Sequence, residues 1–310
     1  MPFSPMIRRL LPVLLLLAGS LPAGAQDAGL AFLRIGSNAA ASAMGDGGVA
    51  YTRDAFATYW NPAGLAAAAS NGAALSHVIW LGNVRTYALA GRFRAGRRGG
   101  VGLFVNATSS GNLQAREGPT AEPDGFFDAQ FVSVGAAYGR RFGPLRLGAG
   151  VKYLSERLYV NDATGYAVDL GAQLGLWQEG LLLGAAWQNL GRMNALEATA
   201  TPLPRLLRAG VAVRPFRILA ARDGAEVLHL LLNAELSHVF PEERTQLHAG
   251  GSARVLDIIW LRAGVITDDA VRRFTFGAGL DYSALVFDYA FLPFDSGFGR
   301  GHVLTLSYAW

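Results

Sequence analysis

The larger, C-terminal part of the chain alternates apolar side chains with glycine, alanine or polar residues, in segments of roughly ten residues each. Successive side chains of a β-strand point to opposite faces, so each such segment has one apolar face and one small or polar face. This pattern is typical of strands whose apolar face contacts lipid. In one segment the apolar face is Val168, Leu170, Ala172, Leu174 and Leu176, and the opposite face is Asp169, Gly171, Gln173 and Gly175.

The pattern predicts an all-β fold, a transmembrane antiparallel β-barrel of about fourteen strands, an even number as expected for a single-chain outer-membrane barrel. With both termini in the periplasm, the short links at 142–144, at 178–179 and near Asp257 and Ser283 fall on the periplasmic side, and a longer link at 215–225 is an exception. The longer links at 107–129, 190–205 and 293–300 fall on the outside, as such barrels require. The strands are expected to begin near Gly72, Val84, Gly99, Gln130, Leu145, Thr164, Gly180, Leu206, Glu226, Thr245, Ile258, Arg273, Ala284 and Gly301.

The first residues predict a secretory signal peptide. Arg8 and Arg9 precede a short apolar run at 10–17, and the small residues 23–25 fit a cleavage site, so the mature chain is expected to begin at Gln26. We expect a signal peptide at 1–25, a plug segment at 26–71 and a barrel at 72–310, located in the bacterial outer membrane. Outer-membrane lipid is the first expected partner.

Composition narrows the classes of function. The chain is 51% hydrophobic and 16% charged, yet no stretch reaches the ~18 apolar residues of a spanning helix. It has no cysteine, which excludes disulfides and thiolate metal sites. The formal charge of +4 falls to +2 when the two signal-peptide arginines are removed (4 − 2), and the basic residues are scattered, so no nucleic-acid partner is expected.

The chain ends on an aromatic residue that follows an alternating apolar strand. This ending resembles the recognition signal by which bacteria insert outer-membrane barrels. An ordinary edge strand that stops on tryptophan is the alternative interpretation. The residues of the predicted insertion signal are Leu304, Leu306, Tyr308 and Trp310.

The inward face of the predicted strands is unusually rich in glycine, and a barrel of this size would then have a wide lumen. The stretch before the first strand is rich in small residues that allow close backbone approach, so we expect it to fill that lumen. Tyr59 and Trp60 are expected to anchor it. Pro62 biases Asn61 toward an extended conformation, and Gly64 permits a positive φ. A helix start with Asn61 as N-cap is an alternative interpretation that is compatible with the first.

The run at 44–65, MGDGGVAYTRDAFATYWNPAGL, resembles the N-terminal block of the PorV/PorQ family, which is related to FadL-type barrels. The FadL group carries a similar Asn-Pro-Ala motif in its plug. The resemblance implies a fourteen-strand outer-membrane barrel with an N-terminal plug, or hatch. The matching plug residues are Met44, Gly45, Asp46, Trp60, Asn61, Pro62, Ala63 and Gly64.

No catalytic or metal-binding motif emerges, and we expect no enzyme, no metal and no cofactor. The five histidines lack metal-ligand spacing. Ser237 and His238 are adjacent, but adjacent strand residues face opposite sides and cannot form a nucleophile–base pair. Inward ionisable residues are expected to pair with one another or with the plug: Lys152, Asp169, Glu235, Arg262, Arg273, Asp281 and Asp288.

Two functions remain open. The resemblance implies a non-enzymatic adaptor of type IX protein secretion that engages the translocon or the C-terminal domain of a cargo protein, with the loop at 107–129 as the expected contact. The alternative is a FadL-like channel for a hydrophobic ligand, with a pocket formed by Phe32, Leu33, Phe56 and Trp60. A lipid-modifying enzyme is a third interpretation, and it lacks a recognisable site.

Overall fold

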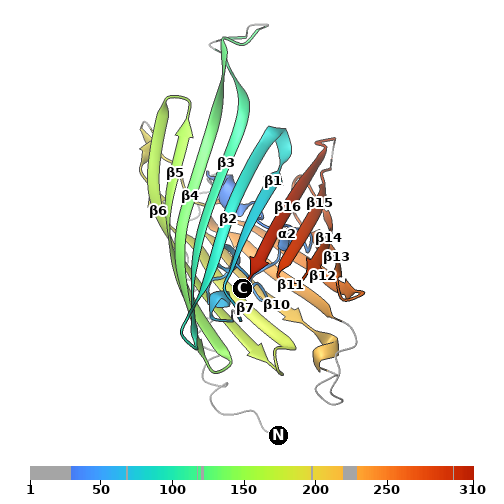
Figure 1. Cartoon of the computed structure of the whole chain (residues 1–310). Coiled ribbons are helices and arrows are strands. Elements are labelled where there is room, and N and C mark those ends of the chain that lie inside the picture. The colour runs from blue at the N-terminus through green and yellow to red at the C-terminus, as the bar shows by residue number, and fades with distance from the viewer. Residues whose placement is uncertain are drawn as a thin grey trace.

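The computed structural model describes residues 29–67, 69–116, 118–119, 122–196, 198–218, 229–295 and 297–310. The predicted signal peptide lies outside these residues. Fourteen strands form a closed antiparallel barrel (Figure 1), which confirms the predicted architecture. Its strands are β1 (Gly72–Ile79), β2 (Val84–Ala95), β3 (Gly99–Ala115), β4 (Gly125–Phe142), β5 (Leu145–Leu158), β6 (Asn161–Leu176), β7 (Leu181–Met193), β10 (Leu206–Val213), β11 (Leu230–Val239), β12 (Arg244–Val255), β13 (Ile259–Ile266), β14 (Phe274–Tyr282), β15 (Leu285–Pro293) and β16 (Arg300–Ala309).

The barrel closes where the first strand pairs with the last. Gly72 lies opposite Ala309, and Ile79 lies opposite His302. We call the end of the barrel where β1 begins and β16 ends the termini end, and the opposite end the loop end. The tight connections after β4, β6, β12 and β14 all lie at the termini end, while a short two-stranded sheet, β8 (Ala195–Leu196) with β9 (Thr199–Ala200), lies at the loop end. Two short 3-10 helices, η3 (Leu81–Asn83) and η4 (Phe240–Glu242), lie in loop-end connections.

The outer surface of the barrel is apolar. Leu75, Leu170 and Leu236 are exposed, with 55%, 45% and 54% of their residue surface accessible. Their strand neighbours on the opposite face, such as Asp169 and Glu235, are buried inside the barrel. A protein interior would cover these leucines, so the exposed apolar register is the lipid-facing surface of an outer-membrane barrel. Among the described residues, no helix is both long and apolar enough to cross a membrane.

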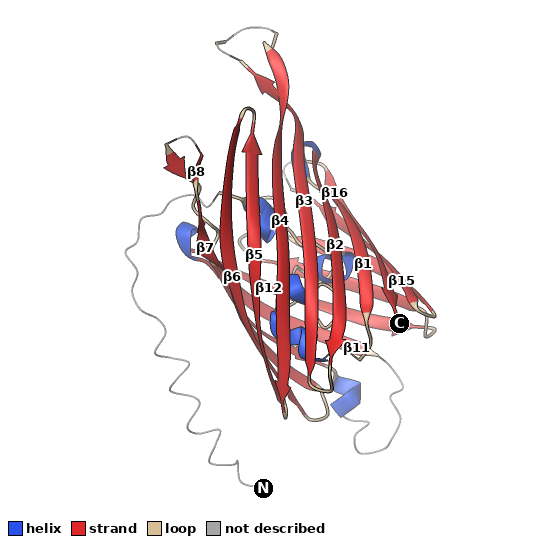
Figure 2. Ribbon diagram, turned by 60° about the vertical axis from the view of Figure 1, so that its left-hand side comes forward, coloured by secondary structure: helices blue, strands red, loops and turns tan. Residues whose placement is uncertain are grey.

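Residues 29–67, called here the N-terminal segment, lie within the barrel (Figure 2). The segment contains four short helical elements: η1 (Ala31–Arg34), α2 (Ala39–Ser42), α3 (Ala57–Trp60) and η2 (Pro62–Ala67). Alanine is the most frequent residue in these elements, and its small side chain lets their backbones approach the inward-facing wall closely. Phe56, Trp60 and Leu65 are almost completely buried.

The predicted loop at 107–129 is largely wrong. β3 continues to Ala115 and β4 begins at Gly125, and together they project beyond the loop end as a two-stranded hairpin (Figure 1). Pairing of β3 with β2 ends at Ser110, and pairing of β4 with β5 begins at Ala129. Residues 106–112 are all small or polar, and the register shifts between Ser110 and Leu113, so the alternation on which the prediction depends is absent there.

Candidate functional site

Trp60 is the central contact between the N-terminal segment and the barrel. Its ring is fully buried, and its Nε1 donates a hydrogen bond to Asn38 Oδ1 at 2.7 Å. The guanidinium of Arg208, from the wall strand β10, lies 5.0 Å from the centre of the indole ring. Tyr59 meets the same ring edge-on, with centroids 5.1 Å apart, and its hydroxyl donates to the carbonyl of Ile35 at 2.8 Å. The Tyr59–Trp60 pair therefore links α3 to Ile35 and Asn38 within the segment and to Arg208 of the wall.

The Asn-Pro-Ala-Gly motif forms a second joint. Asn61 is extended, with φ −163° and ψ 108°, as a residue before proline prefers. Its Nδ2 donates to the carbonyls of Val49, Ala172 and Ala185 at 2.8, 3.1 and 3.2 Å. Its Oδ1 accepts the N–H of Ala63 at 3.1 Å. Ala172 and Ala185 lie on β6 and β7, so one amide links the segment to two wall strands.

Two expectations for this motif are revised by the geometry. The predicted short helix is a 3-10 helix over Pro62–Ala67. Gly64 does not adopt a positive φ. It is needed instead for space, because a Cβ there would lie 2.1 Å from the carbonyl oxygen of Thr52.

The inward-facing glycines of the wall leave room for the backbone of the N-terminal segment. A Cβ on Gly264 would lie 2.1 Å from the amide nitrogen of Gly45, and one on Gly148 would lie 2.3 Å from the carbonyl carbon of Pro62. Gly45 itself has φ +77°, and its N–H donates to Thr275 Oγ1 at 3.0 Å. Met44 is buried against Gly250 in the same way. The space in front of these inward-facing glycines is therefore filled by the backbone of the N-terminal segment.

Most of the predicted lumen charges are paired in the structure. Lys152 lies 2.8 Å from Asp169, and Arg262 lies 2.6 Å from Asp288. Asp281 pairs with Arg254 at 3.1 Å. Glu235 pairs with Arg208 at 2.7 Å and also accepts the N–H of Val49 at 2.9 Å, so it contacts the N-terminal segment directly.

The inward placement of Arg273 is wrong. Arg273 is exposed and lies just before β14, where the strand alternation no longer applies. Its neighbour Arg272 is the buried residue: it forms an ion pair with Asp46 of the N-terminal segment and donates from Nε to Asp269 Oδ2 at 3.1 Å. Arg272 lies outside β14, so the strand alternation does not predict the contact that connects the loop at 267–273 to the segment.

A second ion-pair cluster lies at the termini end, and its residues are not among the charges predicted from the sequence. Glu179, in the turn after β6, bridges Arg53 of the N-terminal segment and Arg146 of β5. Burial lowers the pKa of Arg53 to about 10; Arg146 contributes to the decrease and Glu179 opposes it. Arg53 therefore remains charged at neutral pH. Arg146 has the same strand parity as the inward-facing Gly148 and Lys152, so the alternation alone predicts that it points into the lumen. Its partner Glu179 lies in a turn, where no alternation predicts the direction of a side chain.

The structure contains a cavity of about 230 Å³ at the loop end, between the N-terminal segment and strands β10 to β12. It is lined by four arginines, two aspartates, a serine and a histidine, and also by apolar residues that include Ile35, Trp80, Leu206 and Val239. A smaller cavity of about 160 Å³ lies at the termini end beside Asp54 and Arg92. No group of described residues has the composition of a metal site. The four arginines are Arg34, Arg208, Arg244 and Arg272.

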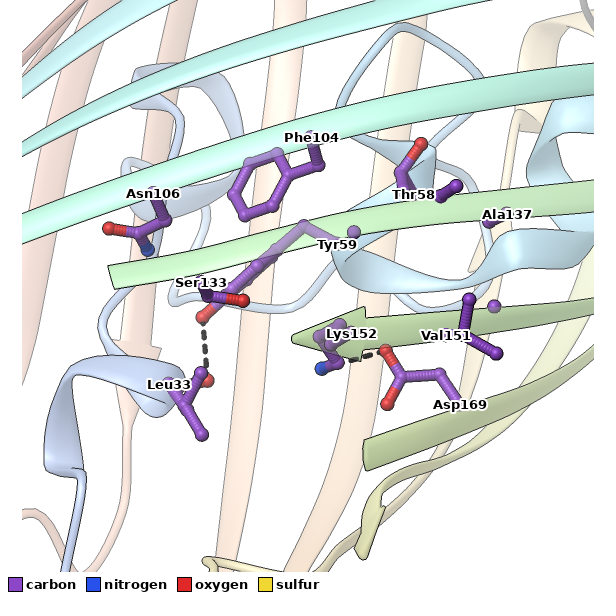
Figure 3. Close-up of a pocket in the computed structure, with 13 residues that line it drawn as sticks. Leu33, Thr58, Tyr59, Phe104, Asn106, Ser133, Ala137, Val151, Lys152 and Asp169 are labelled. Carbon is purple, nitrogen blue, oxygen red and sulfur yellow. Dashed lines mark hydrogen bonds and ion pairs between the residues drawn. The ribbon is translucent and has the colours of Figure 1, made fainter. Parts of the chain in front are cut away.

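The residues proposed for a hydrophobic pocket are mostly packed against other side chains. Phe32 and Leu33 belong to a buried cluster with Leu154 and Met193, and Phe56 meets Phe104. Leu33 and Tyr59 border a space of about 10 Å³, scarcely larger than one water molecule, beside the Lys152–Asp169 pair (Figure 3).

The predicted insertion residues lie on the outer face of the last strand. Leu306 and Tyr308 are both 48% exposed, and Trp310 follows the end of β16. The rings of Tyr308 and Trp310 stack with centroids 5.5 Å apart. Leu304 shares this register and is partly buried.

The family model of the type IX secretion system protein PorV matches residues 24–167, which confirms the resemblance predicted from the run at 44–65. The toluene transporter TodX of Pseudomonas putida has the same fold, with a TM-score of 0.60 and 13% identity over 88% of this chain and 98% of that chain. The toluene transporter TbuX of Ralstonia pickettii gives a TM-score of 0.62 and 14% identity over 90% of this chain and 100% of that one. No curated protein matches the chain.

Proposed function

We propose that this chain, an outer-membrane barrel resembling the PorV family through residues 24–167, is an adaptor of protein secretion whose lumen is closed by its own N-terminal segment. It is exported by the signal peptide at 1–25 and begins, when mature, at Gln26. The loop end faces the cell exterior and engages a translocon subunit or the C-terminal domain of a cargo protein. The N-terminal segment serves as a plug, held by Trp60, Asn61 and the ion pairs of Asp46 and Arg53.

The projecting β3–β4 hairpin carries this proposal. Beyond Ser110 and Ala129 the two strands pair with each other and have no other strand beside them among the described residues. Such an unpaired edge can accept an extended segment of another chain. Phe126 on this hairpin is 64% exposed, and Phe127 contacts Tyr159 of the neighbouring turn with ring centroids 5.6 Å apart. Exposed aromatic side chains are frequent in protein interfaces.

Replacing Phe126 with serine tests this surface. We expect Phe126→Ser to lower the amount of cargo or translocon protein recovered with the tagged chain from native outer membranes by about tenfold, the usual effect of losing one aromatic interface anchor. The matched control is Phe142→Ser, an exposed phenylalanine (51%) at the termini end of the same strand. Equal recovery with both variants, or no secretion protein with the unaltered chain, would contradict the adaptor role.

A FadL-like channel for hydrophobic small molecules is the second candidate, favoured by the similarity in fold to two toluene transporters. This function requires an apolar path past the plug. Phe32, Leu33 and Phe56 are packed into buried clusters. The loop-end cavity has apolar lining residues such as Trp80 and Leu206, but four arginines lie among them, so the described residues offer a continuous apolar path little support. Mass spectrometry of compounds extracted from the purified chain distinguishes the two: bound hydrocarbon or fatty acid supports the channel.

A further inference from the structure

Ser237 and His248 form a hydrogen-bonded pair across two neighbouring strands of the lumen. Ser237 Oγ lies 2.8 Å from His248 Nε2. Ser237 is on β11 and His248 on β12, where it lies opposite Glu235, two residues from Ser237 and on the same inward face. Both side chains are buried, and both line the loop-end cavity. His238, which is adjacent to Ser237 in sequence, is bonded to Thr245 and not to Ser237, as expected for neighbouring strand residues.

The hydrogen bonds of His248 fix its tautomer when the ring is neutral. His248 Nδ1 lies 2.7 Å from the carbonyl oxygen of Gly45 in the N-terminal segment. A carbonyl oxygen only accepts, so Nδ1 carries the proton and donates it. Nε2 is then the unprotonated nitrogen, and it accepts the hydrogen bond from the Ser237 hydroxyl. A serine that donates to an imidazole, which a third group orients, has the arrangement of an activated nucleophile and its base.

Two arginines that line the same cavity each have a buried nitrogen without a hydrogen-bond partner among the described residues. Arg208 lies directly opposite Ser237 in the pairing of β10 with β11. Within the described part of the chain, Arg208 Nε and Arg272 Nη1 have no hydrogen-bond partner, although the two side chains are only 4% and 6% exposed. Cationic N–H donors beside a nucleophilic serine can stabilise the negative oxygen that develops when it attacks a carbonyl group.

We propose that Ser237 and His248 are a catalytic nucleophile–base dyad that hydrolyses small carboxylic esters in the loop-end cavity. Ser237 Oγ forms a bond to the ester carbonyl carbon while its proton passes to His248 Nε2. The bond between that carbon and the alcohol oxygen breaks, and the alcohol leaves with the proton from Nε2. Water then attacks the acyl-serine, His248 takes and returns its proton, and the carboxylic acid is released. A cavity of about 230 Å³ limits the substrate to a small acyl group.

This activity goes beyond the adaptor function and does not depend on it. A fluorophosphonate probe tests it on the full-length chain in detergent micelles, since this reagent modifies serines activated by a base. We expect one probe group per chain, located at Ser237 by peptide mapping, and p-nitrophenyl acetate hydrolysis with an initial burst. Ser237→Ala should abolish both. His248→Gln should slow labelling by about 100-fold or more, the usual effect of losing a general base.

The matched control is Ser76→Ala, because Ser76 is also a buried serine facing the lumen but bonds to Thr305 and not to a histidine. Labelling and hydrolysis should be unchanged in this variant. An unlabelled Ser237 in the unaltered chain overturns the proposal, whatever the variants do. Labelling that proceeds equally fast in a folded His248→Gln chain overturns it as well.

Discussion

A barrel that lacks residues 29–67 is expected to conduct ions steadily across a planar lipid bilayer, with a conductance more than about tenfold above that of the full chain, because the bore of a fourteen-strand barrel is wide when nothing fills it. The inward register contains glycines such as Gly148 and Gly264, which have no side chain to fill the space that the segment leaves. Removal of the segment should therefore leave open the space that its backbone fills in front of these glycines.

Circular dichroism must show that the shortened chain retains its β-barrel spectrum. The matched control deletes residues 116–124, between β3 and β4, which include none of the contacts of the N-terminal segment named above. This control should conduct no better than the full chain. A folded barrel without residues 29–67 that stays closed would show that the segment is not a plug.

Trp60→Ala is expected to lower the free energy of unfolding by about 3–5 kcal/mol, the cost of removing a large buried aromatic side chain. The indole is fully buried, and its loss removes the bond to Asn38 and the contact with Arg208. Urea titration of the barrel in lipid vesicles measures the change. The segment should also become accessible to protease, because Trp60 joins it to the wall.

Trp177→Ala is the control for this substitution. Trp177 is 65% exposed in the turn after β6, so its replacement should change the stability by less than about 0.5 kcal/mol. If both substitutions had the same small effect, Trp60 would not anchor the segment.

Local alternation was sufficient to predict the barrel wall. Gly72, Val84, Gly99, Leu145 and Leu206 are the observed first residues of their strands, because the period of two is strict where one face is apolar. The projecting hairpin was missed because residues 106–112 are all small or polar and show no alternation. Arg272 was missed because register cannot be extended beyond a strand end.

The contacts within the lumen depend on residues far apart in the chain, which no local pattern connects. Asp46 and Arg272 are separated by 226 positions, and Glu235 binds the backbone of Val49 across 186. The Ser237–His248 pair joins two strands diagonally, so a search within one strand finds only His238. The resemblance to a family identified the motif around Asn61, whereas its hydrogen bonds to β6 and β7 required the fold.

The placement of the leucine-rich face against hydrocarbon is tested most directly by spin labels, because a chain without cysteine accepts a single label at any chosen site. Two variants on β11 are compared in lipid vesicles: Leu236→Cys on the outer face and Ser237→Cys on the inner face. We expect the label at 236 to collide more often with oxygen, which concentrates in lipid, than with a water-soluble nickel complex, and the label at 237 to be shielded from lipid. Greater access of the nickel complex at 236 would contradict this placement.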